Sequence, residues 1–205
     1  MSARRVLLLD HRDSFVHLLA DQIARLGCEV DVMRTGMPLY TWTRCLERQA
    51  PDLVVLSPGP GHPAEAGLAV EWLQTRPNVP VFGVCLGHQI IGMVAGAEVR
   101  RGDEPAHGEA CEILWHDQPF ATPLPQRMPV ARYHSLVVVE PRAPLRTLAT
   151  GRDRGSDVVM AIEHTELPQI GVQFHPESVL TPHGQLLLQN VLDWAGTRAL
   201  SVETN

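Results

Sequence analysis

The chain has 205 residues, of which 44% are hydrophobic, and a formal net charge of −6 at pH 7. This length suits one domain with a substantial core, and the negative charge argues against nucleic acid or an anionic membrane as a partner. No apolar run is long enough to span a bilayer, and the N-terminal apolar stretch ends at Asp10, which predicts a first strand rather than a secretion signal.

The cysteines are Cys28, Cys45, Cys85 and Cys111, and they show neither a Cys-x-x-Cys pair nor a zinc-site spacing. Without a secretion signal they fit a reducing compartment, so we expect a cytoplasmic protein. The sequence also lacks the glycine-rich patterns of phosphate-binding loops. We therefore expect neither a metal nor a cofactor.

The first half of the chain alternates strand-like and helix-like patterns. Short apolar runs predict strands, and apolar residues at helical spacing predict helices, the first of which Asp13 or Ser14 can cap. Strands are expected at Val6–Leu9, Glu29–Arg34, Leu53–Leu56 and Pro80–Val84, and later helices at Thr41–Gln49, Val70–Gln74 and Leu86–Ala95. The alternation predicts a single-domain α/β fold, an open and mostly parallel sheet with helices on both faces. Its functional loops, at His11, Pro58, Cys85 and His175, should meet at the carboxyl edge of the strands.

The second half has a different texture, with short β-like runs between turn signals. The runs are Glu109–Leu114, Met128–Tyr133, Val137–Glu140, Leu145–Thr150 and Val158–His164. They predict an antiparallel extension of the same sheet rather than a second domain core. A final helix is expected from about Pro182, so the domain should cover residues 1–197, followed by a frayed tail at 198–205.

Cys85 stands at a strand-to-helix junction, within Gly83-Val-Cys-Leu-Gly87. This is the spacing of the Gly-x-Ser-x-Gly nucleophile elbow, with sulfur in place of oxygen. The glycines let the backbone turn without Cβ clashes, and the start of the helix supplies N–H groups and a positive dipole end that favour a thiolate. The pattern favours a nucleophile over the alternative, a small buried cysteine.

Two further segments add chemistry to this junction. His175 can take and give a proton, and Glu177 can orient its imidazole, which completes the chain order Cys, His, Glu. In Ser57-Pro-Gly-Pro-Gly61, prolines fix the backbone and Gly59 permits an unusual φ. That segment is either a rigid turn or a preset N–H donor for a developing oxyanion.

Four motifs, in this order, resemble class I glutamine amidotransferases. They are Ser57-Pro-Gly-Pro-Gly61, Gly83-Val-Cys-Leu-Gly-His-Gln89, Tyr133-His-Ser-Leu-Val137 and Gly171-Val-Gln-Phe-His-Pro-Glu-Ser178. The resemblance runs from Asp10 to about Trp194. The Tyr-His-Ser-Leu segment is similar to the glutaminase subunits, or component II, of anthranilate synthase and aminodeoxychorismate synthase.

The resemblance implies a role for each motif residue. Cys85 would attack the side-chain amide of L-glutamine and form a thioester, while His175 protonates the leaving ammonia and then activates water, and Glu177 orients His175. The oxyanion hole would be formed by the N–H groups of Gly59 and Leu86. Substrate contacts are expected from Pro58, Gly59, Pro60, Gln89, Ser135 and Leu136, with His88 beside the elbow. The ammonia would pass to a chorismate-binding synthase subunit in a hetero-oligomer.

The sequence departs from the family pattern at two places. Where the family usually has Asp-Asn-Tyr-Asp-Ser-Phe, this chain has His11 and Arg12 after Asp10, and where the family has His-Gly-Lys it has His107-Gly108-Glu109. Each substitution changes a charge near the expected active edge. The alternatives are that these positions help to dock the partner, or that they have drifted at solvated sites.

Three other functions stay open. The same chemistry could serve aminodeoxychorismate or aminodeoxyisochorismate synthase instead of anthranilate synthase. A non-catalytic, partner-binding subunit is disfavoured by the intact Cys85, His175 and Glu177. A stand-alone γ-glutamyl hydrolase is disfavoured by the Tyr-His-Ser-Leu segment and by the compact chain.

Overall fold

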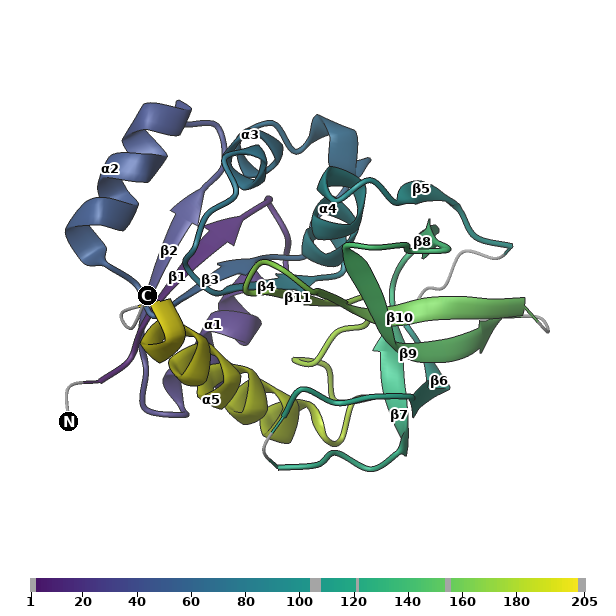
Figure 1. Cartoon of the computed structure of the whole chain (residues 1–205). Coiled ribbons are helices and arrows are strands. Elements are labelled where there is room, and N and C mark those ends of the chain that lie inside the picture. Colours follow the sequence, from purple (N-terminus) through teal and green to yellow (C-terminus); the bar gives the residue numbers. More distant parts are fainter. Residues whose placement is uncertain (1–2, 104–107, 121, 154–155, 203–205) are drawn as a thin grey trace.

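The computed structural model describes residues 3–103, 108–120, 122–153 and 156–202, which form one large mixed sheet covered by helices (Figure 1). The sheet has nine strands in the order β2-β1-β3-β4-β11-β10-β9-β6-β7. Its parallel half contains β1 (Arg5–Asp10), β2 (Glu29–Arg34), β3 (Leu53–Leu56), β4 (Val81–Val84) and β11 (Gln169–Val172). Its antiparallel half contains β10 (Ser156–His164), β9 (Leu145–Asp153), β6 (Glu109–Trp115) and β7 (Arg127–Arg132).

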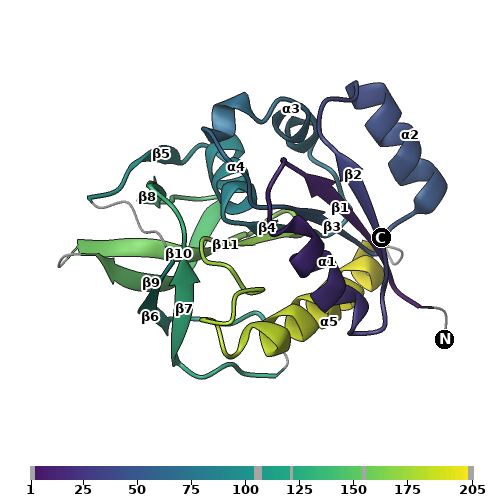
Figure 2. The same cartoon turned by 180° about the vertical axis from the view of Figure 1, so that it is seen from behind.

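Helices cover both faces of the parallel half, as predicted. The helices α2 (Leu39–Gln49), α3 (Leu68–Gln74) and α4 (Leu86–Val94) lie on one face, and α1 (Val16–Ala24) and α5 (Gly184–Val202) lie on the other (Figures 1 and 2). Strand β1 shows why, because successive side chains of a strand point to opposite faces. Leu7 and Leu9 join the core under α2–α4, whereas Val6 and Leu8 join the core over α1 and α5.

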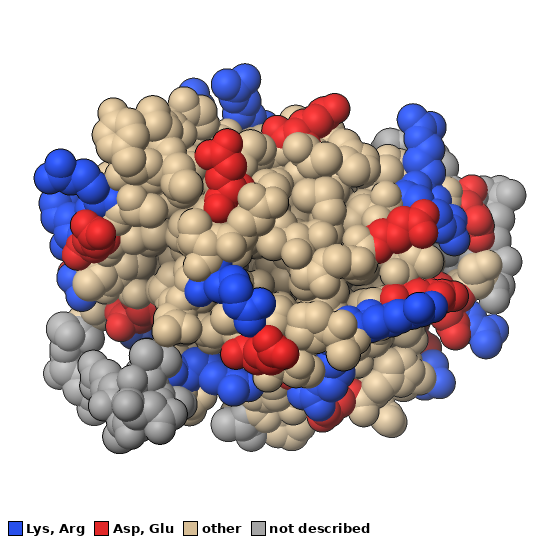
Figure 3. Space-filling model, turned by 45° about the horizontal axis from the view of Figure 1, so that its top comes forward, with Lys and Arg blue, Asp and Glu red and all other residues tan. Residues whose placement is uncertain are grey.

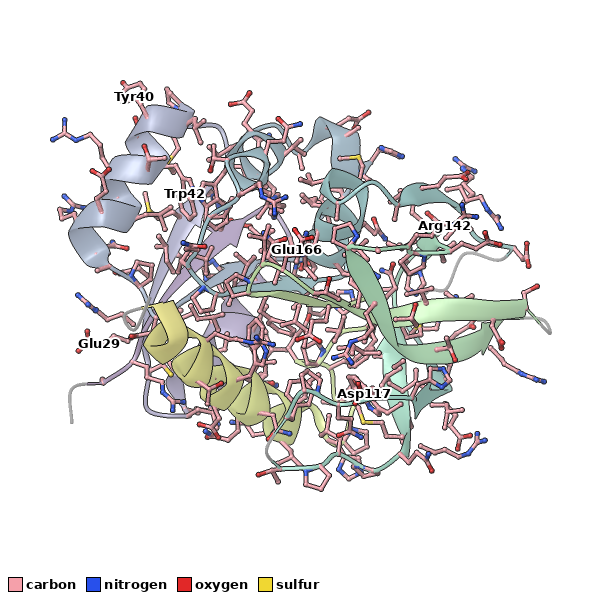
Figure 4. The ribbon with its side chains drawn as sticks, viewed as in Figure 1. Glu29, Tyr40, Trp42, Asp117, Arg142 and Glu166 are labelled. Carbon is pink, nitrogen blue, oxygen red and sulfur yellow. The ribbon has the colours of Figure 1, made fainter. Side chains whose placement is uncertain are left out.

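The outer helix α2 is anchored by one aromatic contact. Trp42 is fully buried and meets Trp72 of α3 edge-on, with ring centroids 5.5 Å apart. Tyr40, two residues earlier, points away from the sheet and is 69% exposed (Figure 4). Acidic and basic side chains are intermixed on the face seen in Figure 3, so this face presents no large field of one sign.

Two expectations about the second half are corrected by the structure. The Val137–Glu140 run does not extend the main sheet, because β8 (Leu136–Val139) pairs with β5 (Glu98–Arg101), a strand that the sequence did not predict, in a separate two-stranded sheet. Gly92 of α4 makes room for this small sheet, since a Cβ there would lie 2.9 Å from Val138 Cγ2.

The final helix also differs from its prediction. It begins at Gly184, close to the predicted start at about Pro182, and it continues past Thr197 to Val202, into the segment 198–205 that the sequence predicts to be frayed. Residues 203–205 of the predicted tail lie outside the described residues. Within the described part of the chain, no helix is both long and apolar enough to cross a membrane.

We expect two helical glycines to respond oppositely to alanine. A Cβ at Gly87 of α4 would lie 2.3 Å from the carbonyl oxygen of Leu56, whereas a Cβ at Gly196 of α5 meets nothing closer than the Arg4 guanidinium at 3.6 Å. Gly87→Ala should therefore lower the free energy of unfolding by several kcal/mol, roughly 3. Gly196→Ala should raise it by about 0.5–1 kcal/mol. Denaturant unfolding checks both, and equal stabilities for Gly87→Ala and wild type would contradict the close packing.

Candidate active site

Cys85 lies at a sharply strained turn between β4 and α4. Its φ of 52° and ψ of −97° lie outside the regions that non-glycine residues usually occupy, and it is 6% exposed. Its amide donates to the Val172 carbonyl, 2.9 Å away, which ties the turn to β11. The flanking glycines are needed because the backbone segments pack closely, and not because they adopt a positive φ. A Cβ at Gly83 would lie 2.5 Å from the Gly87 carbonyl, and a Cβ at Gly87 would collide with β3.

His175 and Glu177 form a buried pair beside this turn. The Nδ1 of His175 lies 2.6 Å from Glu177 Oε1, and the two side chains are 4% and 1% exposed. A carboxylate at that nitrogen fixes its proton there and leaves Nε2, which has no standard hydrogen-bond partner among the described residues, free for proton exchange. Burial lowers the pKa of His175, but Cys85 as a thiolate and the Glu177 carboxylate outweigh burial and raise the pKa to about 10. The site therefore favours an imidazolium beside the sulfur.

The loop that carries His175 is braced from two sides. The His175 amide donates to the Ala131 carbonyl of β7 at 3.1 Å, which makes an isolated antiparallel bridge. The Thr181 hydroxyl donates to the His175 carbonyl at 2.7 Å and accepts the Ala131 amide at 3.0 Å. From α1, the Gln22 side chain donates to the Glu177 carbonyl at 2.9 Å. These bonds hold the imidazole in place without contacting it.

A chain of side-chain amides runs from the Tyr-His-Ser-Leu segment to the sulfur. Gln89 Nε2 donates to the Leu136 carbonyl and to Gln173 Oε1, both at 3.1 Å, and Gln173 Nε2 lies 3.7 Å from Cys85 Sγ. His134 Nδ1 also lies 2.9 Å from the Leu136 carbonyl. Gln173 was not among the residues predicted from the sequence. The signal was its spacing, because residues two apart on an extended segment share a face, and Gln173 precedes His175 by two.

The candidate substrate site is a cavity of about 160 Å³. This is well below the roughly 300–1,000 Å³ of drug-sized ligand sites, and it suits a molecule as small as one amino acid. Six predicted residues line its wall: Gly59, Pro60, Cys85, Gln89, Ser135 and Leu136. Three further lining residues were not predicted: Gly61, Tyr133 and His134. Pro58 was predicted to contact substrate but does not line the cavity. Its carbonyl instead accepts a hydrogen bond from the Ser57 hydroxyl at 2.6 Å.

The Ser57–Gly61 loop is held by the residue that departs from the family pattern. The backbone amide of His11 donates to Ser57 Oγ at 2.9 Å, and its Nδ1 lies 3.3 Å from the same oxygen. Burial lowers the pKa of His11 to about 4, so the ring is neutral at pH 7. The expected unusual φ at Gly59 is wrong, since only Gly61 of these two has a positive φ, at 89°. Gly59 is required because a Cβ would lie 2.6 Å from His11 Cβ.

Two aromatic rings flank the His175 imidazole. Tyr133 meets His175 edge-on with centroids 5.1 Å apart, and Phe15 lies 6.2 Å from His175 and 5.8 Å from Tyr133. Both rings are also partly open to solvent, at 38% for Tyr133 and 40% for Phe15. Neither ring was predicted from the sequence to lie at the site.

The remaining charge changes are placed on the surface. Arg12 is exposed at φ 64° and lines a second cavity of about 640 Å³, which shares Pro60 with the substrate cavity. Glu109 is exposed at the start of β6, opposite Arg132 of β7. His107, part of the altered motif, lies outside the described residues. His88 is fully buried beside Gly171 and does not line the substrate cavity.

The fold and site define a class that the comparisons confirm. A family model described as glutamine amidotransferase class-I matches residues 7–194, and the chain belongs to this family. A solved structure from Thermoplasma acidophilum, described as a putative GMP synthase subunit, is 20% identical, with a TM-score of 0.84 over 100% of both chains. That likeness confirms the predicted fold class.

The most informative relatives carry a narrower name. The chain is 42% identical to "anthranilate synthase component 2, pyocyanine specific" of Pseudomonas aeruginosa, over 96% of each chain. It is 40% identical to anthranilate synthase component 2 of Thermus thermophilus, over 95% of this chain and 94% of that one. For the Mycobacterium tuberculosis protein of the same name, the identity is 39%, over 94% and 83%.

We expect the buried histidine of α4 to make the protein acid-sensitive. Burial lowers the pKa of His88 to about 4, whereas an unfolded histidine titrates near 6.5. Between pH 6.5 and pH 4 the unfolded chain therefore binds a proton at His88 that the folded protein does not bind. The free energy of unfolding falls as the pH is lowered through this range. His88→Gln should reduce the loss of unfolding free energy between pH 7 and pH 5 by about 2 kcal/mol. Urea unfolding at both pH values measures this. The exposed His17→Gln is the control, and an unchanged loss in His88→Gln would contradict a neutral His88.

Proposed function

We propose that this chain is the glutaminase subunit of an anthranilate synthase, and that Cys85, His175 and Glu177 are its catalytic residues. The observation that carries the proposal is the buried His175–Glu177 pair beside a cysteine at a strained strand-to-helix turn. Each predicted member of the triad is present, and the raised pKa of His175 favours the ion pair in which sulfur is the nucleophile.

The reaction divides into two halves. The Cys85 thiolate attacks the amide carbon of glutamine, and the oxygen that gains charge is stabilised by the N–H groups of Gly59 and Leu86. Among the described residues, no acceptor takes a hydrogen bond from either amide. His175 gives its proton to the leaving nitrogen, and ammonia departs from the thioester. His175 then takes a proton from water, which attacks the thioester and releases glutamate.

Gln89 is oriented to recognise the amino end of the substrate. Its amide nitrogen donates to the Leu136 carbonyl and to Gln173, which uses both N–H bonds. No described residue donates to its Oε1, and Gln89 lines the cavity. An acceptor at this place suits an α-ammonium group, while Ser135 in the same wall can donate to a carboxylate.

The catalytic assignment predicts a graded loss of activity. Cys85→Ser and His175→Ala should lower glutamine-dependent product formation by the complex by at least about a thousandfold. Glu177→Ala should lose less, because Glu177 orients the imidazole and does not exchange protons with substrate. All three should keep ammonium-dependent activity, which lies on the partner. Cys45→Ser on α2 is the control. Near-normal use of glutamine by Cys85→Ser would refute Cys85 as the nucleophile.

The partner is proposed to dock over an apolar rim, formed by Phe15, Leu18, Tyr133 and Val179. These are four of the described exposed large hydrophobic residues, at 40%, 40%, 38% and 93% exposure. They come from the start of α1, the Tyr-His-Ser-Leu segment and the catalytic loop, which surround His175. A rim of this kind around a reaction centre is typical of a protein interface. Ammonia that leaves there would pass into the partner rather than into water.

The same docking would couple binding to activity. Arg12 and Pro60 line the 640 Å³ cavity, and Pro60 also lines the substrate cavity. A partner that fills the larger cavity would therefore press on the loop that carries the Gly59 N–H. We propose that the lone chain hydrolyses glutamine slowly, and that the partner shifts the loop into its active arrangement. Each tenfold of activation requires about 1.4 kcal/mol of differential binding.

We expect the rim and the charged positions to control the complex. Val179→Asp should weaken binding to the native synthase subunit about tenfold or more, because it places a charge in an apolar interface.

Arg12→Glu and Glu109→Arg should weaken binding and glutaminase activity together, more at low salt. Titration calorimetry and glutamate release, with and without the partner, measure these effects. Tyr40→Asp on α2 is the control. Full activity of the lone wild-type chain would refute the coupling, and unchanged affinity in all three variants would refute the docking site.

The acceptor is proposed to be chorismate on the route to anthranilate. The support is the name shared by relatives that match this chain nearly end to end at about 40% identity. The alternatives are aminodeoxychorismate and aminodeoxyisochorismate synthases, which would need the same glutaminase. Purifying the complex and identifying its product from chorismate and glutamine separates them.

A further inference from the structure

Gln173 is a buried side chain that the proposed reaction does not use. It follows β11 directly, its amide donates to the Met160 carbonyl of β10 at 2.9 Å, and its side chain is completely buried. Its Nε2 approaches Cys85 Sγ at 3.7 Å, and its Oε1 accepts from Gln89. A fully buried amide whose two ends meet the nucleophile and a substrate-binding residue needs an explanation beyond packing.

The direction of this amide is fixed by a backbone carbonyl. The Leu136 carbonyl can only accept, so the atom of Gln89 that faces it must be the NH₂ group. The same NH₂ group faces Gln173, so the Gln173 atom in that contact must be the oxygen. The NH₂ group of Gln173 therefore points at sulfur. A hydrogen-bond donor at this place stabilises an anionic sulfur more than a neutral thiol.

We propose that Gln173 is a positioning residue that holds the Cys85 sulfur as a thiolate and couples it to occupancy of the substrate site through Gln89. The sulfur then has two stabilising neighbours, the His175 imidazolium and the Gln173 amide. When substrate binds Oε1 of Gln89, it polarises the amide chain, and the hydrogen bond to sulfur strengthens. The inference rests on the proposed function, in which Cys85 is the nucleophile.

Gln173→Met tests the donor directly, because methionine keeps the volume and removes both hydrogen bonds. The pH midpoint for alkylation of Cys85 by iodoacetamide, followed by mass spectrometry of the Cys85 peptide, should rise by about one unit, and the alkylation rate measured below the wild-type midpoint should fall about tenfold. The kcat for glutamine should fall by a similar factor. Gln169→Met is the matched control, since Gln169 is a buried residue at the other end of β11, about 13 Å from Gln173 along the chain. It should leave the alkylation profile unchanged.

Two further variants, Gln173→Glu and Gln89→Met, keep the test decisive if Gln173→Met does not fold. Gln173→Glu has the same shape but places a carboxylate against sulfur, so the alkylation midpoint should rise further. Gln89→Met breaks the link without touching sulfur, so it should raise the midpoint by a smaller amount as well as raising KM. Alkylation profiles of Gln173→Met or Gln173→Glu that match wild type would refute the donor. An unchanged profile in Gln89→Met would refute the coupling. Alkylation reports on the sulfur alone, so an unchanged alkylation profile would refute only the role of Gln173. Glutamine-dependent activity in Cys85→Ser would instead refute Cys85 as the nucleophile.

Discussion

The contact that the rest of the site depends on is the approach of α4 to strands β3 and β4. It is possible because Gly83 and Gly87 carry no Cβ, and a Cβ at either would lie within 2.5 Å of a carbonyl group. This approach forces the intervening Cys85 to a φ of 52°. The strained turn holds the sulfur at the carboxyl edge of the sheet and at the start of a helix. The strands β1, β3 and β11 also end at this edge.

Around that turn lie four buried histidines, and their neighbours divide them into two charge states. Burial lowers the pKa values of His11 and His88 to about 4, and burial together with Arg132 lowers that of His134 to about 3. His175 is equally buried, yet its pKa is raised, because among these four it is the one that lies between the Cys85 thiolate and a carboxylate. Among the neutral rings, His11 lies within hydrogen-bond distance of Ser57 Oγ and His134 within that of the Leu136 carbonyl, whereas His175 is the one charged ring of the four, which suits the proposed proton transfer.

The sequence predicted the inner strands of the parallel half closely, because β1, β3 and β4 are short, buried apolar runs. It also led us to propose the triad of Cys85, His175 and Glu177, because these residues lie in short local motifs. It could not predict the β5–β8 sheet, since that pairing depends on Gly92 and Val138 meeting across 46 positions of sequence. Nor did it identify Gln173 or the apolar rim, because their proposed roles come from neighbours that are remote in sequence.

The central claim is that Cys85 carries the glutamyl group during catalysis. The direct measurement is acid quenching of the complex during turnover of glutamine, followed by mass spectrometry of the cysteine peptides. We predict a mass increase that corresponds to a γ-glutamyl thioester on the Cys85 peptide, and no such increase on the peptides of Cys28, Cys45 or Cys111. A glutamyl adduct on another cysteine, or turnover without any adduct when thioester hydrolysis is slowed at low temperature, would contradict it.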